Sequence, residues 1–420
     1  MILRIEKFLF YLFLFLIPFQ IRFFLHNAGN EWNSIFLYAG DLIFIAILIL
    51  VVLRKGIRFE KKDIFLLIFI LVAGLSLFAT SSLGISAYRF IKLLEFVLLY
   101  KYICSNVGIL SKTLSVLFYS GVLQAILAIA QFIKQGSIGI KFIEAGIFSP
   151  NSPGVANFIL NGERIMRSYG SFLHPNVLAA FLLLAIFAFY ALFLQRDIKG
   201  ELKGLVIVSC FLVVVFALFL TFSRTAIVVF GVMSLIFFLI EFFQARQKQV
   251  IKLFGLFLVS CILAVIILFP YLKARFFTIS MEEQAIDLRF FYNKMALSMI
   301  KEKPILGIGI GNFVNYSENY PAYLRAASKM LGLTTIPDWI YQPVHNIYLL
   351  IASEIGILGV IVFLGFIVLN IRRSNLRWEV RPLTILFVGF LILALADHYF
   401  WTLQTGGIMF WLALALTTKE

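Results

Sequence analysis

The sequence predicts an all-α polytopic membrane protein with about twelve transmembrane helices. Hydrophobic residues make up 62% of the 420 residues and charged residues only 14%, whereas charged residues account for about 25% of a typical soluble domain. Nearly uncharged apolar runs of about 20 residues, the length that crosses a hydrocarbon core, recur along the chain. Because these runs are continuous rather than alternating, they predict helices and not a β-barrel.

Hydropathy gives an ordered set of predicted spans with short connections between most of them. Two connections, near 134–171 and 272–344, are much longer, and we expect them to carry structure of their own. We therefore divide the chain into N-terminal helices with the first long connection, 1–171, and a second region, 172–420. The predicted spans lie near 8–24, 35–53, 63–82, 84–104, 109–133, 172–194, 203–221, 224–243, 251–271, 345–370, 382–397 and 405–418.

The net charge of +15 is distributed in a way that predicts the orientation of the chain. Alternate connections are rich in lysine and arginine, and the others carry few, so the positive-inside rule places both termini in the cytoplasm. Because the charges are spread over separate short loops, the pattern does not indicate nucleic-acid binding. The basic residues on the inner side are Arg54, Lys55, Arg58, Lys61, Lys62, Arg196, Lys199, Lys203, Arg246, Lys248, Lys252, Arg372, Arg373, Arg377 and Arg381.

The long outer connection 272–344 contains a predicted helix in EEQAIDLRFFYNKMALSMIKEKP. Acidic residues begin this stretch, basic residues end it, and Pro304 follows, an order that suits the helix dipole. The next segment, ILGIGIGNF, has the spacing GxGxG. Since it follows a helix, it is not a dinucleotide-binding motif, and we interpret it as a tight backbone segment folded over the membrane surface.

Charged residues inside predicted spans are candidates for function, because burying them in a membrane is costly. The fourth span carries Arg89, Lys92 and Glu95 in SAYRFIKLLEF, and the second carries Asp41. We expect Arg89 and Asp41 to lie at similar depth and to pair. Such a pair is either a structural link between two helices or part of a substrate site.

Three arginines and three histidines converge on the predicted outer face: Arg167, Arg224, Arg289, His174, His345 and His398. Taken singly, such an arginine is a snorkelling residue at a span end and such a histidine an interfacial one. Taken together they favour chemistry on a lipid pyrophosphate. Arginine binds phosphate through two parallel hydrogen bonds, and histidine is a general base near neutral pH. We expect His174 at the outer surface, because Pro175 suits the first turn of a helix.

No cofactor or metal ion is predicted. The three cysteines lie within or at the ends of spans and have no zinc-site spacing. The first outer connection, HNAGNEWN, offers no paired carboxylates. The expected reaction is therefore independent of metal.

Several motifs in a fixed order resemble the O-antigen ligase and O-antigen polymerase superfamily of bacterial membrane glycosyltransferases. They are SFLHPNVLAAF, TFSRTA, KPILGIGIGNF, HNIYLLIASEIGILG and DHYFWTLQTGG, and they span roughly 167–407. The resemblance implies a GT-C-like fold in the bacterial inner membrane with its active site facing the periplasm, where 272–344 is then the large periplasmic loop. It also implies transfer of a glycan from undecaprenyl pyrophosphate to lipid A–core, without ATP or metal.

The same resemblance assigns site residues. The essential arginines and histidine of the family correspond to Arg224, Arg289 and His345, and Arg167 and His174 belong to a neighbouring motif. We expect Asn346 to orient His345 or to start the following helix. Three further candidates complete the set: Arg89 from the fourth span, and His398 with Asp397 as a second polar cluster. Gly356 and Gly359 are expected to permit close helix packing.

Two other functions fit parts of the pattern. A polymerase that joins repeat units on the same lipid carrier needs the same arginines and base and differs only in its acceptor. A polysaccharide transporter or flippase also has about twelve spans. However, the sequence shows no repeated halves, and its ionisable residues gather at the outer face rather than at the midplane. Ligase is the first interpretation, polymerase the second and transporter the third.

Overall fold

The computed structural model describes residues 1–418 apart from 55, 58, 107, 142, 145, 147, 196–200, 245–246, 278–281 and 375–378. Among the basic residues that predicted the orientation, Lys55, Arg58, Arg196, Lys199, Arg246 and Arg377 lie outside the described residues.

Every predicted span contains a helix. These helices are α1 (Ile2–Leu16), α2 (Ala39–Arg54), α3 (Ile64–Leu75), α4 (Leu83–Ser105), α5 (Leu110–Lys134), α6 (Pro175–Gln195), α7 (Glu201–Leu220), α8 (Arg224–Phe242), α9 (Gln247–Phe277), α13 (Ile347–Arg373), α14 (Arg381–Leu393) and α16 (Gln404–Thr417). Within the described residues, six helical stretches are long and apolar enough to cross a membrane: Lys61–Ala79, α5, α6, α8, α9 and α13. The chain is thus a multi-helix membrane protein, and twelve crossings remain a prediction.

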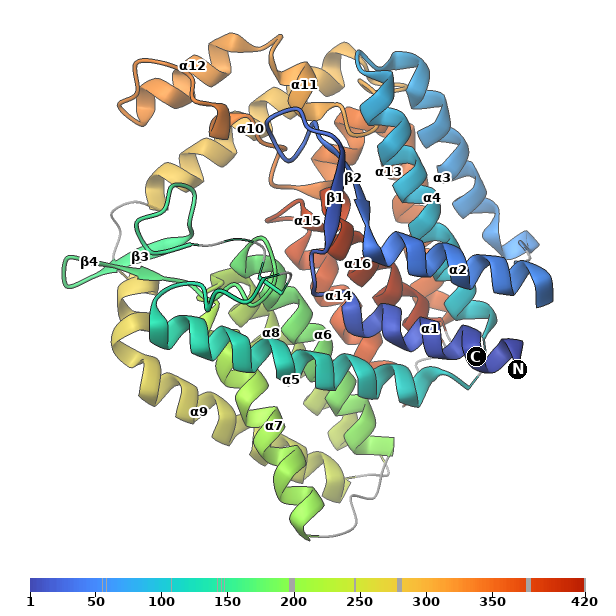
Figure 1. The fold of residues 1–420 in the computed structure, drawn as a ribbon, viewed down its shortest axis with the longest axis vertical. Coiled ribbons are helices and arrows are strands. Elements are labelled where there is room, and N and C mark those ends of the chain that lie inside the picture. The colour runs from blue at the N-terminus through green and yellow to red at the C-terminus, as the bar shows by residue number, and fades with distance from the viewer. Residues whose placement is uncertain are drawn as a thin grey trace.

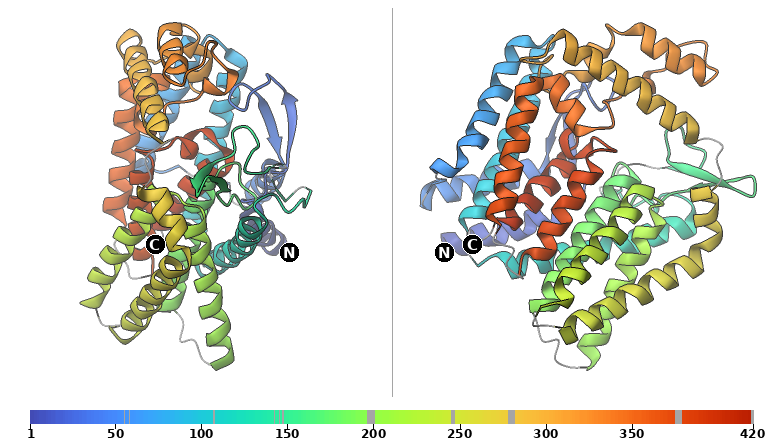
Figure 2. Two further views of the ribbon diagram at one scale, coloured as in Figure 1. Left: turned by 90° about the vertical axis from the view of Figure 1, so that its left-hand side faces the viewer. Right: turned by 180° about the vertical axis from the view of Figure 1, so that it is seen from behind.

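α6 forms the centre of the helical region and is almost completely buried. It packs against α5, α7 and α14, so the main core combines residues from both predicted regions of the chain. In Figure 1, α5 to α9 form the lower part of the molecule, and α1 to α4 lie beside α13 to α16 at the right. The same grouping appears from behind in Figure 2, whose side view shows the two termini apart from each other.

The first two predicted spans were wrong at their facing ends. α1 ends at Leu16, because Pro18 has no N–H to donate and so cannot continue the hydrogen bonds of the helix. The chain then forms strand β1 (Arg22–His26), which pairs antiparallel with β2 (Ile35–Tyr38). Residues that hydropathy placed in the ends of two spans therefore form a hairpin. A second hairpin, β3 (Asn157–Leu160) with β4 (Glu163–Met166), lies in the first long connection.

The predicted pair between Arg89 and Asp41 was also wrong. Asp41 pairs with Lys92, which lies about one helical turn deeper in α4 than Arg89 does. Lys92 also contacts Glu95 at 3.0 Å, and Gln404 Nε2 donates to Asp41 Oδ1 at 2.7 Å. Arg89 instead donates to the backbone carbonyls of two other segments, as described below.

The long connection 272–344 folds over one end of the helical region. Its predicted helix is confirmed as α10 (Glu282–Glu302), and it is followed by α11 (Phe313–Ser317) and α12 (Pro321–Met330). These elements have a small core of their own, which includes Tyr292, Met299, Leu324 and Ile340. They lie together at the top of Figure 1.

The glycine segment after α10 packs into a break in α13. Gly356 interrupts that helix with φ +83°, and the Ile357 N–H donates to the Pro304 carbonyl at 2.9 Å. In return, the N–H groups of Ile308 and Gly309 donate to the carbonyls of Ser353 and Glu354, each at 2.9 Å. A Cβ atom on Gly356 would lie 1.9 Å from the Ile305 carbonyl oxygen. Gly356 therefore admits an extended loop and not, as predicted, a neighbouring helix.

Candidate active site

A large cavity opens where the long connections meet the ends of the helices. Its volume is about 660 Å³. Its walls come from the starts of α6, α8 and α13, the end of α9, the middle of α10, and the hairpin loop between β1 and β2. The charged and aromatic residues that line it include Glu31, Trp32, Arg167, His174, Arg224, Arg275, Arg289, Tyr292, His345, Asp397 and His398.

Three helices begin at this cavity, although first-turn N–H groups of two of them are already bonded: the Asn176 N–H donates to His174 Nδ1 at 3.1 Å and the Leu349 N–H donates to Asn346 Oδ1 at 3.0 Å. α6 begins at Pro175 directly after His174, α8 begins at Arg224, and α13 begins at Ile347 directly after the His345–Asn346 pair. The first N–H groups of a helix have no partner within it, and the helix dipole is positive at this end. The cavity is therefore suited to an anion even before its arginines are considered.

His345 lies among other rings. Its ring meets that of His398 edge to face with centroids 4.8 Å apart, and the ring of Tyr292 stacks against it at 5.9 Å. His398 is held in turn by Thr402, whose Oγ1 lies 2.8 Å from Nδ1, and by the edge of Trp32 at 5.1 Å. The Nδ1 atom of His345 is buried and has no hydrogen-bond partner among the described residues. Since buried polar atoms rarely lack a partner, this atom calls for one from outside the protein, a water or a substrate group.

A polar chain ties Asp397 to the opposite wall. Asn176 Nδ2 donates to Asp397 Oδ2 at 2.8 Å, and Arg167 Nη2 donates to Asn176 Oδ1 at 2.7 Å. Arg167 Nε also donates to the Thr221 carbonyl at 2.7 Å, and its side chain is almost completely buried. Arg167 therefore links the backbone at Thr221 to Asn176, and Asn176 in turn bonds to Asp397.

The electrostatics of the cavity keep its histidines neutral. Burial lowers the pKa of His174 and of His398 to about 3 each. Burial also lowers the pKa of His345 and brings the pKa of Arg167 to about 10. At neutral pH the imidazole of His345 is thus unprotonated, which is the state that a general base requires.

The structure brings together seven of the nine residues proposed from sequence: His345, Arg224, Arg289, Arg167, His174, Asp397 and His398. The other two lie elsewhere. Asn346 caps α13 and accepts a hydrogen bond from the Leu349 N–H at 3.0 Å. Of its two predicted roles, to orient His345 or to start the helix, the second is confirmed. Arg89 lines a second, smaller cavity.

Sequence reasoning missed Arg275, which lies in the last turn of α9 and donates from Nε to the Phe222 carbonyl at 3.2 Å. A signal was present, because Arg275 follows the ninth predicted span on the same side as Arg224. Trp32 and Tyr292 were missed as well. Nothing in the sequence marked them, since their place in the wall depends on the hairpin and on the docking of α10.

One group of side chains has the geometry of a possible metal site. Ligand atoms of His345, Asp397 and His398 all lie within 4.8 Å of one another. Two imidazoles and a carboxylate form a donor set that suits zinc or iron. The metal-free reaction expected from the sequence therefore needs a direct test with a chelator.

Residues 208–364 match a protein-family model described as O-Antigen ligase. Over this segment the chain is similar to O-antigen ligases. The matched segment runs from α7 into α13 and contains Arg224, Arg275, Arg289 and His345, whereas Arg167, His174, Asp397 and His398 are supplied from outside it. Members of this family are membrane glycosyltransferase-like enzymes, ligases or polymerases, that act on lipid-linked glycans. No curated protein matches the chain.

Proposed function

We propose that this protein transfers a glycan from undecaprenyl pyrophosphate to lipid A–core at the periplasmic face of the bacterial inner membrane. The observation that carries the proposal is the shared cavity. Arg224, Arg275 and Arg289 line the same cavity as His345, and the three helices α6, α8 and α13 begin there. Arginine forks and helix N-termini both favour a pyrophosphate, and a neutral histidine beside them favours activation of a hydroxyl group.

The geometry supports a single displacement. His345 takes the proton from an acceptor hydroxyl group as its oxygen forms a bond to the anomeric carbon of the donor sugar. The bond between that carbon and the pyrophosphate oxygen breaks, and its electron pair leaves with the undecaprenyl pyrophosphate. The arginines stabilise the negative charge that develops on the departing group, and His345 then releases its proton to water.

Asp397 acts in this scheme as a positioning residue. One of its carboxylate oxygens lies within 4.8 Å of one imidazole nitrogen of His345 and one of His398. Asn176 and the His398 N–H fix the orientation of the carboxylate. A fixed negative charge at this distance stabilises the imidazolium that forms when His345 accepts a proton.

The test is deletion of the gene, followed by a lipopolysaccharide gel and an analysis of lipid-linked glycans. A ligase predicts bare lipid A–core, with full-length polymer stranded on undecaprenyl pyrophosphate. Core capped by a single repeat unit would show that the protein is a polymerase instead. If neither pool changes, both assignments fail and a transport role or another acceptor replaces them. Restoration by the wild-type gene, and not by a gene encoding Arg224→Ala, links the phenotype to this cavity.

A further inference from the structure

Arg89 of α4 does not line the large cavity, and its own surroundings leave little room for a substrate. The cavity that it does line has a volume of about 40 Å³, which holds a few water molecules and no sugar ring. Its stem packs against the glycine segment, since a Cβ atom on Gly311 would lie 2.2 Å from Arg89 Cγ. The role of this cation therefore follows from its bonds within the protein.

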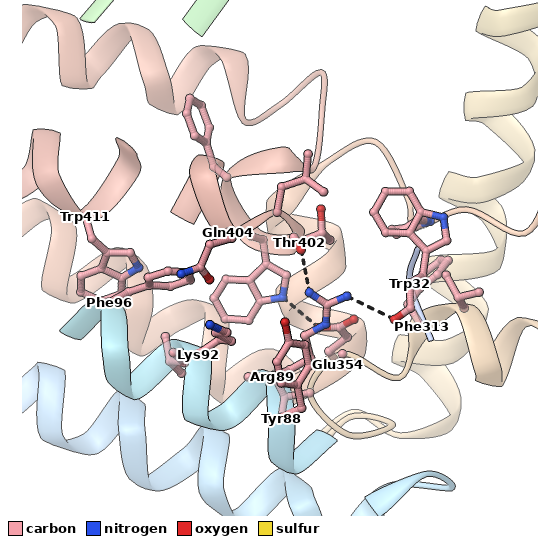
Figure 3. A pocket seen from close by; sticks show the side chains of 18 of the residues that line it. Trp32, Tyr88, Arg89, Lys92, Phe96, Phe313, Glu354, Thr402, Gln404 and Trp411 are labelled. Atoms are coloured by element: carbon pink, nitrogen blue, oxygen red, sulfur yellow. Dashed lines mark hydrogen bonds between the residues drawn. The ribbon is translucent and has the colours of Figure 1, made fainter. Parts of the chain in front are cut away.

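The guanidinium of Arg89 bridges two segments that lie far apart in the sequence. Nη1 donates to the Thr402 carbonyl at 2.7 Å, and Nη2 donates to the Trp32 carbonyl at 3.2 Å. Thr402 ends the short helix α15 (Tyr399–Thr402), and Trp32 lies in the loop between β1 and β2. Figure 3 shows the guanidinium extending between these two segments. One side chain thus ties α4 to the hairpin loop and to α15 through charge-assisted hydrogen bonds.

Both segments held by Arg89 contact the ring of His398. Thr402 Oγ1 lies 2.8 Å from His398 Nδ1, and the ring of Trp32 meets that of His398 edge to face at 5.1 Å. The ring of His398 in turn lies 4.8 Å from that of His345. Because Nδ1 of His345 has no hydrogen-bond partner among the described residues, ring contacts contribute to fixing its orientation.

A second buried charge holds the same short helix. Trp401 Nε1 donates to Glu354 Oε2 at 2.8 Å, and Glu354 is only 2% exposed, next to the break in α13 at Gly356. α15 is therefore fixed from α13 by an anion and from α4 by a cation. Arg89 differs from Glu354 in reaching both segments that contact His398.

We propose that Arg89 is a positioning residue, which fixes His398 and, through His398, the ring of His345. It does so by holding the carbonyls of Trp32 and Thr402 in place. The proposal rests on the glycosyl transfer proposed above and on His345 as its base. A base displaced by about 1 Å lowers the rate by about 100-fold. Lysine cannot replace Arg89, because only the planar fork of a guanidinium presents fixed donors to two carbonyls at once.

The test measures transfer from undecaprenyl-pyrophosphate-linked glycan to lipid A–core by purified full-length protein in nanodiscs, with rates expressed per folded protein. Arg89→Met should lower kcat about 10- to 100-fold and leave KM for both substrates within about twofold. Arg89→Lys should lower kcat about tenfold. Arg373→Met is the matched control, because Arg373 also donates to a backbone carbonyl, that of Lys62 at 3.0 Å, and lines neither cavity. It should transfer as the wild type does.

A double-mutant cycle separates positioning from a general loss of stability. His398→Ala removes the ring through which Arg89 acts but keeps the proposed base, so its transfer should stay measurable. In that background Arg89→Met should lower kcat by less than about twofold more. If the two effects multiply instead, Arg89 does not act through His398. If His398→Ala abolishes transfer, His398 is itself the base and the proposal falls.

The remaining outcomes distinguish this proposal from the proposed function. Unchanged kcat in Arg89→Met overturns the positioning role and leaves the glycosyl transfer standing, and a rise in KM with kcat unchanged shows that Arg89 binds substrate. If the wild type transfers only to a second lipid-linked repeat unit, the ligase assignment fails, and the cycle is measured with that acceptor. If the wild type transfers to neither acceptor, the proposed function and the positioning role fail together.

Discussion

At the C-terminal ends of α2, α4 and α8, charged side chains occur in buried pairs. Arg54 contacts Glu6 at 2.9 Å, Lys101 contacts Asp63 at 2.5 Å and Arg381 contacts Glu241 at 2.6 Å. At the N-terminal ends of α6, α8 and α13, the described lining of the large cavity has four arginines and only two carboxylates, Glu31 and Asp397. Paired charges lock helices together, whereas an excess of one sign around an open space indicates a ligand of the opposite sign.

The largest effect is expected from the histidine of the cavity. His345→Ala should lower kcat by about 10²–10⁴-fold, because it removes the proposed general base, and the protein should still insert and fold. The measurement is transfer by purified protein, with insertion checked by membrane fractionation. His26→Ala is the matched control, since His26 is exposed on β1. Near-normal transfer by His345→Ala would remove His345 as the base.

At the opposite end of α8, where Glu241 is paired with Arg381, a substitution should change the stability of the protein rather than its activity. Arg381→Ala leaves the carboxylate of Glu241, which is 1% exposed, without this partner. We expect a loss of about 3–5 kcal/mol in the free energy of unfolding, with KM for the donor unchanged. Unfolding in detergent measures the first and the transfer assay the second. The double variant Arg381→Met with Glu241→Met should recover most of the loss, and a failure to do so would argue against a simple ion pair.

A charge-conserving change tests whether the arginines bind phosphate by shape. Arg224→Lys keeps the positive charge and loses the planar fork, so kcat/KM should fall by about tenfold. Arg325→Lys on the exposed face of α12 is the control. A silent Arg224→Lys would mean that Arg224 only anchors the end of α8 at the membrane surface.

The smallest effect is expected from a chelator. EDTA should change the transfer rate by less than about twofold, since arginines and helix ends supply the positive charge that a metal would otherwise supply. Loss of activity that zinc or iron restores would show instead that His345, Asp397 and His398 hold an ion.

Much of this comparison was predictable from the sequence, and the exceptions have identifiable causes. Long apolar runs placed the helices, and the arginines and histidines of the outer face were found because such residues are rare there. Lys92 took the place of Arg89 beside Asp41 because a shift of one helical turn cannot be read from hydropathy. Trp32 entered the wall because a hairpin replaced the expected ends of two spans. Gly356 accepts a loop that comes from fifty residues earlier, a tertiary contact that local pattern does not encode.

The packing of the glycine segment into the break of α13 at Gly356 has a consequence for protein engineering. Because 304–309 and 353–357 exchange backbone hydrogen bonds, the large loop and the following helix form one exchangeable unit. In a chimaera that takes 272–344 from a relative but keeps its own 353–357, the two segments that exchange these hydrogen bonds come from different proteins. Domain swaps intended to transfer acceptor preference should therefore carry both segments together.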